Sequence, residues 1–168
     1  MAYANQPTNL NYLNVISFQT NFLRMPTVDY FCQRVGIPGS SLTSLMQSTP
    51  FAGIPMEGDN LVFEDLSIEF VIDEDLKNYM EIYNWMQAIG FPDNFDQYDS
   101  EKDKDLKSDG NIIIHTNKSN PNYNVTFKDI FPVALGGINF DTNATSLEPI
   151  VVNAVFRYTG AFSVKKIG

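Results

Sequence analysis

The chain has 168 residues, which is enough for one domain that buries its own hydrophobic core. Hydrophobic residues make up 43% of the chain and aromatic residues 13%, so the composition excludes an intrinsically disordered protein. The formal net charge of -9 argues against a free-standing nucleic-acid binder, which normally presents a basic surface.

The sequence contains no recognisable catalytic or metal-binding motif. Cys32 is the single cysteine, so no internal disulfide or thiolate metal site can form, and we interpret it as a small buried hydrophobe. His115 is the single histidine, and a general base or a metal site needs further partners. The first residues lack the pattern of a signal peptide, and no segment is apolar over the length of a bilayer. We therefore expect a non-enzymatic, soluble protein of a cytoplasm, without cofactor or metal.

The N-terminal part predicts an arm followed by a β-hairpin. Residues 1–14 are polar and asparagine-rich, so we expect an extended arm that is ordered only where a neighbour holds it. Residues 15–23 and 28–35 both alternate between apolar and polar side chains, with a turn signal at Met25-Pro26-Thr27. These two segments predict an antiparallel pair of strands.

Residues 40–55 predict an extended, partly apolar arm. Pro50 and Pro55 argue against a central strand. A connection of this length usually has a function or a partner, and its apolar residues are spread among small polar ones. The side chains that we expect to contact a neighbouring subunit are Leu42, Leu45, Met46 and Phe51.

A strand and then a helix follow. Residues 61–72 read as one long strand whose phase shifts at Glu64-Asp65, as a β-bulge would produce. The helix is expected at about 75–89, with Asp73 as its N-cap and Gly90 near its end. An apolar stripe recurs at helical spacing through Leu76, Tyr79, Met80, Tyr83, Met86 and Ile89.

Ile82 and Trp85 lie beside the main stripe of this helix. Two interpretations are open. The helix has a wide buried face, or these two side chains form a second apolar face for a neighbouring subunit, since large aromatic residues are enriched at interface centres. Ile82 and Trp85 therefore join the candidate interface residues.

The C-terminal part is β-rich. Residues 93–110 read as a mobile, charged loop. Strand signals follow at residues 111–117, 123–127, 130–135 and 146–162. The chain as a whole is therefore predicted to be mainly β with one α-helix, as an arm at 1–14 and one domain at 15–168.

Several segments in this order resemble the tail tube superfamily of contractile bacteriophages. The resemblance covers most of residues 15–160. It rests on the N-terminal strands, the long extended arm, the strand-to-helix link and four short segments. These are Phe31-Cys-Gln-Arg-Val-Gly-Ile-Pro-Gly39, Ile82-Tyr-Asn-Trp-Met86, Val125-Thr-Phe-Lys-Asp-Ile-Phe-Pro-Val133 and Ala154-Val-Phe-Arg-Tyr158.

The resemblance implies a β-sandwich or β-barrel with a flanking helix and no catalysis. It implies a virion tail protein, assembled in the host cytoplasm, whose six copies form a ring around a channel for DNA and the tape-measure protein. It also implies contacts with sheath, neck or baseplate proteins. The ring is a repeating tube subunit or a specialised ring that starts, completes or caps the tube, such as a tube initiator or sheath stabiliser.

Other classes of function remain as alternatives. A β-sandwich binding module, for example for glycans, would be monomeric or weakly dimeric, and an enzyme of unrecognised type is the third alternative. In the ring interpretation, the acidic composition would suit a channel that must not hold DNA, provided that the acids face the channel.

Overall fold

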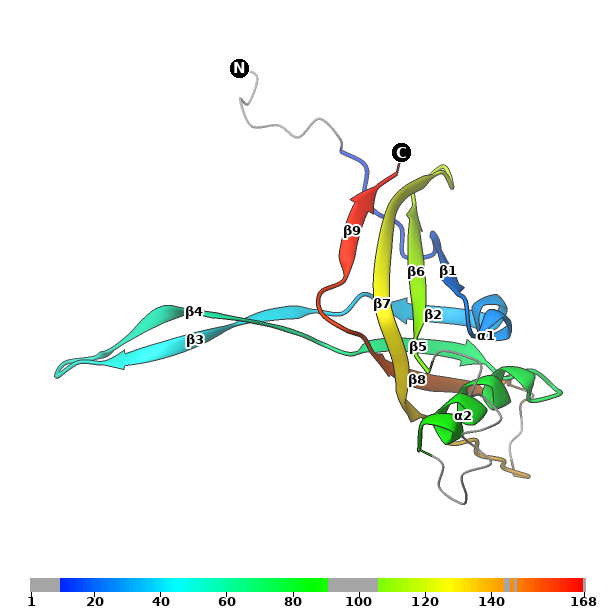
Figure 1. The fold of residues 1–168 in the computed structure, drawn as a ribbon. Coiled ribbons are helices and arrows are strands. Elements are labelled where there is room, and N and C mark those ends of the chain that lie inside the picture. The colour runs from blue at the N-terminus through cyan, green and yellow to red at the C-terminus, as the bar shows by residue number, and fades with distance from the viewer. Residues whose placement is uncertain (1–9, 91–105, 144–145, 147, 168) are drawn as a thin grey trace.

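The structure is a computed structural model that describes residues 10–90, 106–143, 146 and 148–167 (Figure 1). No helix in these ranges is long and apolar enough to cross a membrane. Within them the chain forms nine strands and two helices. In chain order these are β1 (Phe18–Phe22), α1 (Pro26–Phe31), β2 (Cys32–Gly36), β3 (Ser40–Ser48), β4 (Gly53–Phe63), β5 (Leu66–Val71), α2 (Lys77–Gly90), β6 (Ser108–His115), β7 (Pro121–Leu135), β8 (Val151–Arg157) and β9 (Ser163–Lys166).

The long strand β7 joins two antiparallel layers. Its first part pairs with β6 and β9, and its last part, from Phe131 to Leu135, pairs with β8. We refer to β1, β6, β9 and the first part of β7 as the first sheet, and to β2, β5, β8 and the last part of β7 as the second sheet. Between the two parts, Asp129 has a φ of 51°, a left-handed conformation that bends the strand. The strands of the two sheets run in clearly different directions in Figure 1.

The hydrophobic core lies between the two sheets and α2. The first sheet contributes Phe22, Ile112, Val125 and Phe127, all of them buried. The second sheet contributes every alternate residue of β5 and β8, and α2 adds three side chains. These are Leu66, Ile68, Phe70, Val152, Ala154, Phe156, Ile82, Trp85 and Ala88. The prediction of a mainly β, sandwich-like fold is therefore confirmed, with a second, short helix added.

The expected N-terminal hairpin is wrong. Residues 26–31 form α1, because Pro26 occupies the first turn of a helix, where its fixed φ and missing N–H are tolerated. Met25 and Val28 are three residues apart, so their side chains lie on the same side of this turn, and both are buried. Strand β1 therefore pairs with β6, and β2 pairs with β5, instead of with each other.

The single strand expected at residues 61–72 is also wrong. Strand β4 ends at Phe63 and β5 begins at Leu66, so the phase shift at Glu64-Asp65 marks a passage between two sheets. The arm expected at residues 40–55 is most of a β-hairpin formed by β3 and β4. Pro55 is compatible with β4 because both strands of a two-stranded ribbon are edge strands.

The later elements follow the prediction more closely. The strands expected at residues 123–127 and 130–135 are one strand, β7, with the bend at Asp129 between them. The strand expected at 146–162 is β8, which is shorter, and β9 follows without having been predicted. Most of the charged loop at 93–110 lies outside the described residues, but Ser108–Gly110 already belong to β6.

A buried asparagine connects β5 to α2. The helix begins at Lys77, after Leu76 with a φ of 57°, so Asp73 is not its N-cap. The amide nitrogen of Asn78 donates to the Val71 carbonyl at 2.7 Å, and its amide oxygen accepts from the Asp73 and Tyr79 backbone N–H groups at 3.3 and 2.8 Å. This fully buried side chain therefore fixes the angle between strand and helix.

We expect Asn78→Ala to lower the free energy of unfolding by about 2–3 kcal/mol, because it removes three hydrogen bonds and leaves buried backbone groups without partners. Denaturant unfolding followed by tryptophan fluorescence measures this loss. Asn84→Ala, an exposed site on the same helix, is the matched control and should change stability by less than about 0.5 kcal/mol. Equal stability of the two variants would contradict the assigned role of Asn78.

Candidate subunit interfaces

The outer edge of β1 offers backbone hydrogen-bonding groups. The N–H of His115 donates to the Ser17 carbonyl at 3.0 Å, so every second residue from Ser17 faces β6. The backbone groups of Phe18, Thr20 and Phe22 therefore point away from β6. No strand in the described residues pairs with this side, and the Phe22 N–H instead donates to Asp29 Oδ2 at 2.6 Å.

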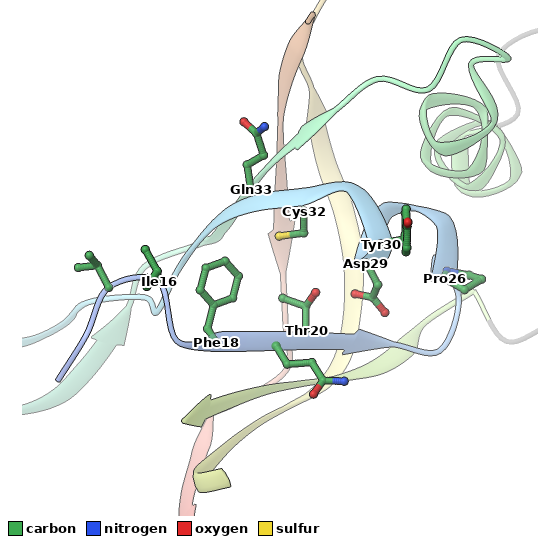
Figure 2. A pocket seen from close by; sticks show the side chains of 10 residues that line it. Ile16, Phe18, Thr20, Pro26, Asp29, Tyr30, Cys32 and Gln33 are labelled. Atoms are coloured by element: carbon green, nitrogen blue, oxygen red, sulfur yellow. The ribbon is translucent and has the colours of Figure 1, made fainter. Parts of the chain in front are cut away.

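A cavity of about 640 Å³ lies beside this edge, between β1, α1 and β2. Figure 2 shows Thr20 of β1 facing Cys32 and Asp29 across it. The other side chains around it are Val15, Ile16, Phe18, Gln19, Pro26, Tyr30 and Gln33. We refer to this cavity as the β1 slot. Its lining is apolar or uncharged apart from Asp29, so it suits a polypeptide segment better than a charged small molecule.

Two ionisable groups of the β1 slot have shifted pKa values. Burial raises the pKa of Asp29, and the hydrogen bond from the Phe22 N–H opposes this shift. Burial raises the pKa of the Cys32 thiol to about 11, so the thiol is protonated at neutral pH and is a poor nucleophile. Cys32 is half-buried, contrary to the prediction of a buried hydrophobe, because it stands at the open edge of the second sheet.

The opposite edge of the first sheet is β9. The Ile167 N–H donates to the Asn122 carbonyl at 2.8 Å, which fixes the hydrogen-bonding phase of this pair. Ser163 and Lys165 therefore face β7, whereas the backbone groups of Val164 and Lys166 point outward. In the described ranges no strand covers them. The first sheet thus ends in two open edges of similar length, four residues in β9 and five in β1.

The outer face of the first sheet is polar. Its inner face carries the core residues Thr20, Ile112 and Val125, so the alternate positions point outward. Next to Asn111 and Thr126, the same outward phase continues to Asp109 in β6 and Lys128 in β7, both of them charged. In the register of the strands, the central outward positions form one row of Asn21, Asn111, Thr126 and Ser163 and a second row of Gln19, Ile113, Asn124 and Lys165. All eight are exposed or half-buried.

The hairpin of β3 and β4 projects from the rest of the molecule (Figure 1). Every residue of β3 is exposed, and the side chain of Phe51 at the tip is 99% exposed. Leu45 pairs with Met56 and Gln47 with Ile54, so one face of the ribbon presents three aliphatic side chains to solvent. Because an isolated two-stranded hairpin is marginally stable in water, this arrangement points to a partner.

The six predicted interface residues separate into two groups. Leu42, Leu45, Met46 and Phe51 are all exposed on the hairpin. Ile82 and Trp85 are buried in the core of their own chain, so the prediction that they form a subunit interface is wrong. The Trp85 side chain is 2% exposed, and its Nε1–H donates to the Leu106 carbonyl at 2.7 Å.

Residues that the sequence analysis missed are also exposed. The helix α2 buries Asn78, Ile82, Trp85 and Ala88, so part of the predicted stripe, including Met80 and Tyr83, faces solvent instead. Ile54 and Met56 were missed because Pro55 lies between them, although their spacing of two is typical of a strand. The short strand β9 gave no signal, because only Val164 in it is apolar.

The N-terminal segment lies beside the turn between β6 and β7. Of the predicted arm at 1–14, residues 10–14 fall in the described part of the chain, and Leu10, Tyr12 and Leu13 are exposed. Tyr12 and Leu13 border a second cavity, of about 630 Å³, together with Tyr123 and several asparagines of the turn.

The described residues contain no group of three or more side chains that could hold a metal ion.

With the geometry of the edges and the hairpin described, the comparison with known proteins shows the family of the chain. The family of phage tail tube proteins matches residues 4–161, nearly the whole chain. The protein therefore belongs to the phage tail tube protein family, and it is a structural protein of the tail tube type. The comparison with curated proteins found no match to its sequence.

Solved structures of contractile injection systems share the fold. The tube terminating cap of the anti-feeding prophage has a TM-score of 0.65 and 13% identity, over 99% of this chain and 100% of that one. The sheath/tube terminator of an extracellular contractile injection system in its extended state has a TM-score of 0.62 and 13% identity, over 94% and 99%. The sheath–tube complex of such a system has a TM-score of 0.61 and 12% identity, over 93% of both chains.

Proposed function

We propose that this protein is a non-enzymatic subunit whose six copies form a ring of a contractile phage tail. The ring encloses the channel for DNA and the tape-measure protein. The observation that carries the proposal is the first sheet, which has two open edges of similar length and a polar outer face. Such a sheet is incomplete alone, since open edges invite pairing with other chains.

In the proposed ring, β9 of one copy enters the β1 slot of the next copy. The outward backbone groups of Val164 and Lys166 then pair with those of Phe18 and Thr20. This contact joins two different surfaces, so it is heterologous and closes only at a fixed copy number. Four strands per copy and six copies give a closed barrel of 24 strands. At about 4.8 Å per strand its circumference is roughly 115 Å and its diameter about 37 Å.

The hairpin contacts a neighbouring copy in this arrangement. Strand β4 has 11 residues, and at about 3.4 Å per residue it reaches roughly 37 Å. Adjacent copies are only about 19 Å apart around the barrel, whose circumference is roughly 115 Å. A projecting hairpin therefore extends past its nearest neighbour. Burying Leu42, Leu45, Met46 and Phe51 there would remove the exposed apolar surface. The N-terminal arm at 1–14 is proposed as a further contact between copies.

A specialised ring that starts, completes or caps the tube is the second candidate. The observation in its favour is the fit to a tube terminating cap over 99% of this chain and 100% of that one. Either role makes the protein a component of the virion tail, assembled in the host cytoplasm. Either role also predicts contacts with sheath, neck or baseplate proteins.

Replacing a residue of β9 tests the ring. We expect Val164→Pro to prevent ring formation, because proline removes the outward N–H and places its own ring on the edge. The inward hydrogen bonds of Ser163 and Lys165 are kept, and proline is tolerated on edge strands. Val164→Ala, which retains the N–H, is the matched control and should still assemble.

Light scattering and negative-stain images of the same fractions measure the outcome. Wild-type protein and Val164→Ala should show a six-fold mass or rings with a central hole, and Val164→Pro a folded monomer. Tubes would favour the repeating subunit, and isolated rings the specialised ring. Rings of Val164→Pro would disprove the proposed edge pairing. A wild-type monomer that also fails to join a preformed tube would disprove the ring and favour a binding module.

A further inference from the structure

One carboxylate oxygen in the β1 slot has no hydrogen-bond donor. Of the two oxygens of Asp29, Oδ2 accepts from the Phe22 N–H at 2.6 Å. The other, Oδ1, is buried, and no group among the described residues donates a hydrogen bond to it. Leaving a buried charged acceptor unpaired is costly, and such atoms in native proteins nearly always have a partner. Asp29 therefore points to a donor that comes from outside the described chain.

The electrostatic environment of Asp29 favours a positively charged donor. Burial raises the pKa of Asp29, and the nearby Glu81 carboxylate on α2 raises it further. The Thr20 hydroxyl lies across the slot and opposes this shift, but it forms no hydrogen bond to Oδ1 (Figure 2). Glu81 Oε1 accepts from the Thr27 hydroxyl at 2.6 Å, and its Oε2 is also buried without a partner among the described residues. A cation entering the slot would stabilise the ionised form of Asp29.

Strand β9 carries a cation on the appropriate face. Val164 pairs in register with Val125, a core residue on the inner face of the first sheet. Because side chains alternate along a strand, Lys166 lies on the same inner face as Val164, and Lys165 lies on the outer face. Thr20, which faces Asp29 in Figure 2, is also an inner-face residue. The side chain of Lys166 is exposed in the single chain.

The strand directions fix how β9 meets β1 of the next copy. The pairs β1–β6, β6–β7 and β7–β9 are all antiparallel, so β1 and β9 run in opposite directions. Rotation about a ring axis preserves this relation, and β9 therefore enters the slot antiparallel to β1. Val164 then lies opposite Thr20, and Lys166 lies opposite Phe18 and diagonal to Thr20. Diagonal neighbours are about 7–8 Å apart, within reach of a long side chain.

We propose that the Lys166 ammonium of one copy donates to Asp29 Oδ1 of the next copy. This inference rests on the ring proposed above and assigns a recognition pair to its edge contact. Backbone pairing alone accepts any exposed strand, because every strand edge offers the same groups. A lysine that must meet a buried carboxylate adds selectivity, since a strand with an apolar or acidic side chain at this position would leave Asp29 unpaired.

Assembly of single and double variants tests the pair. Asp29→Asn keeps the size of the side chain and an oxygen that accepts from the Phe22 N–H. Lys166→Met removes the ammonium and keeps most of the length. Lys165→Met removes the same charge from the adjacent, outer-face position and is the matched control. Light scattering over a dilution series measures the concentration at which half of the protein is in rings, with negative-stain images of the same samples and circular dichroism as a check of folding.

We expect Asp29→Asn and Lys166→Met each to raise this concentration about tenfold or more, and Lys165→Met less than about threefold. The double variant of Asp29 and Lys166 should assemble no worse than the weaker single variant, because both changes remove one interaction.

Normal assembly of Lys166→Met would overturn the inference while leaving the ring intact, even if Asp29→Asn failed to fold. Fully additive effects in the double variant would overturn it as well, since Asp29 would then be paired with water or with another group. If wild-type protein forms no rings, the proposed function fails and the inference fails with it.

Discussion

Replacing both Leu45 and Met46 with aspartate should abolish ring assembly and leave a folded monomer. Both side chains are about two-thirds exposed on the projecting hairpin, so the change should lower the folding stability of the isolated chain only slightly. In a ring, a contact on the face of Leu45 would lose one buried aliphatic side chain, about 1.5–3 kcal/mol, and would gain a charge in an apolar site, and Met46 would have the same effect on the opposite face of the ribbon. Because each ring repeats the contact at every junction, assembly should fail at concentrations where wild-type protein is fully assembled.

Light scattering measures assembly in this experiment, and tryptophan fluorescence reports on folding. The single tryptophan, Trp85, lies in the core and far from the exposed hairpin in the sequence, so its emission should not change. The charge-matched control combines Asn84→Asp and Asn117→Asp, both at exposed positions outside the hairpin. Normal assembly of the Leu45 and Met46 double variant would show that the hairpin is not a subunit contact.

The second large effect is expected for Trp85→Ala, which should lower the free energy of unfolding by about 3–5 kcal/mol. The substitution leaves a cavity beside Phe156, whose ring centroid lies 6.2 Å from that of Trp85. It also removes the hydrogen bond to the Leu106 carbonyl and the ring over which the Arg24 guanidinium lies at 5.0 Å. Denaturant unfolding monitored by circular dichroism measures the loss.

Tyr83→Ala provides the comparison for this prediction. Tyr83 is on the same helix but is substantially exposed, and its main ring contact is a stacked one with Tyr79 at 6.5 Å. Its removal should therefore cost at most about 1 kcal/mol. If Trp85→Ala were as stable as Tyr83→Ala, Trp85 would be a passive residue and its assignment to the core would be refuted.

The sequence allowed the elements with strong local signals to be predicted. Helix α2 was expected within two residues of its observed start, because a run of good helix formers ends at Gly90. The side of the helix that is buried could not be predicted, because apolar residues occur on most of its circumference. Only the position of the core, which depends on β5 and β8, selects Ile82 and Trp85 over Met80 and Tyr83.

The strand pairing could not be predicted, because the paired strands lie far apart in the chain. Alternation in residues 28–35 suggested a strand, but Pro26 and the burial of Val28 against the core favour a helical turn. The partner of β1 is β6, about 90 residues away, and no local pattern identifies it. For the candidate interface, exposed apolar residues within 40–55 were identified because the segment has no core of its own. The open edges were missed, since an edge is defined by which strands are absent beside it.

The carboxylate of Asp29 has a consequence for the accuracy of assembly. By accepting the hydrogen bond of the Phe22 N–H, it occupies one end of the β1 edge and leaves the positions of Phe18 and Thr20 for an incoming strand. In the proposed ring, a strand shifted by two residues toward Phe22 could not bond to the Phe22 N–H, because that N–H already donates to Asp29. Asp29 would thus act as a stop that fixes a single registration between copies. A shift in registration changes the tilt of every strand in a closed barrel. By preventing such a shift, Asp29 would keep the inner diameter of successive rings the same.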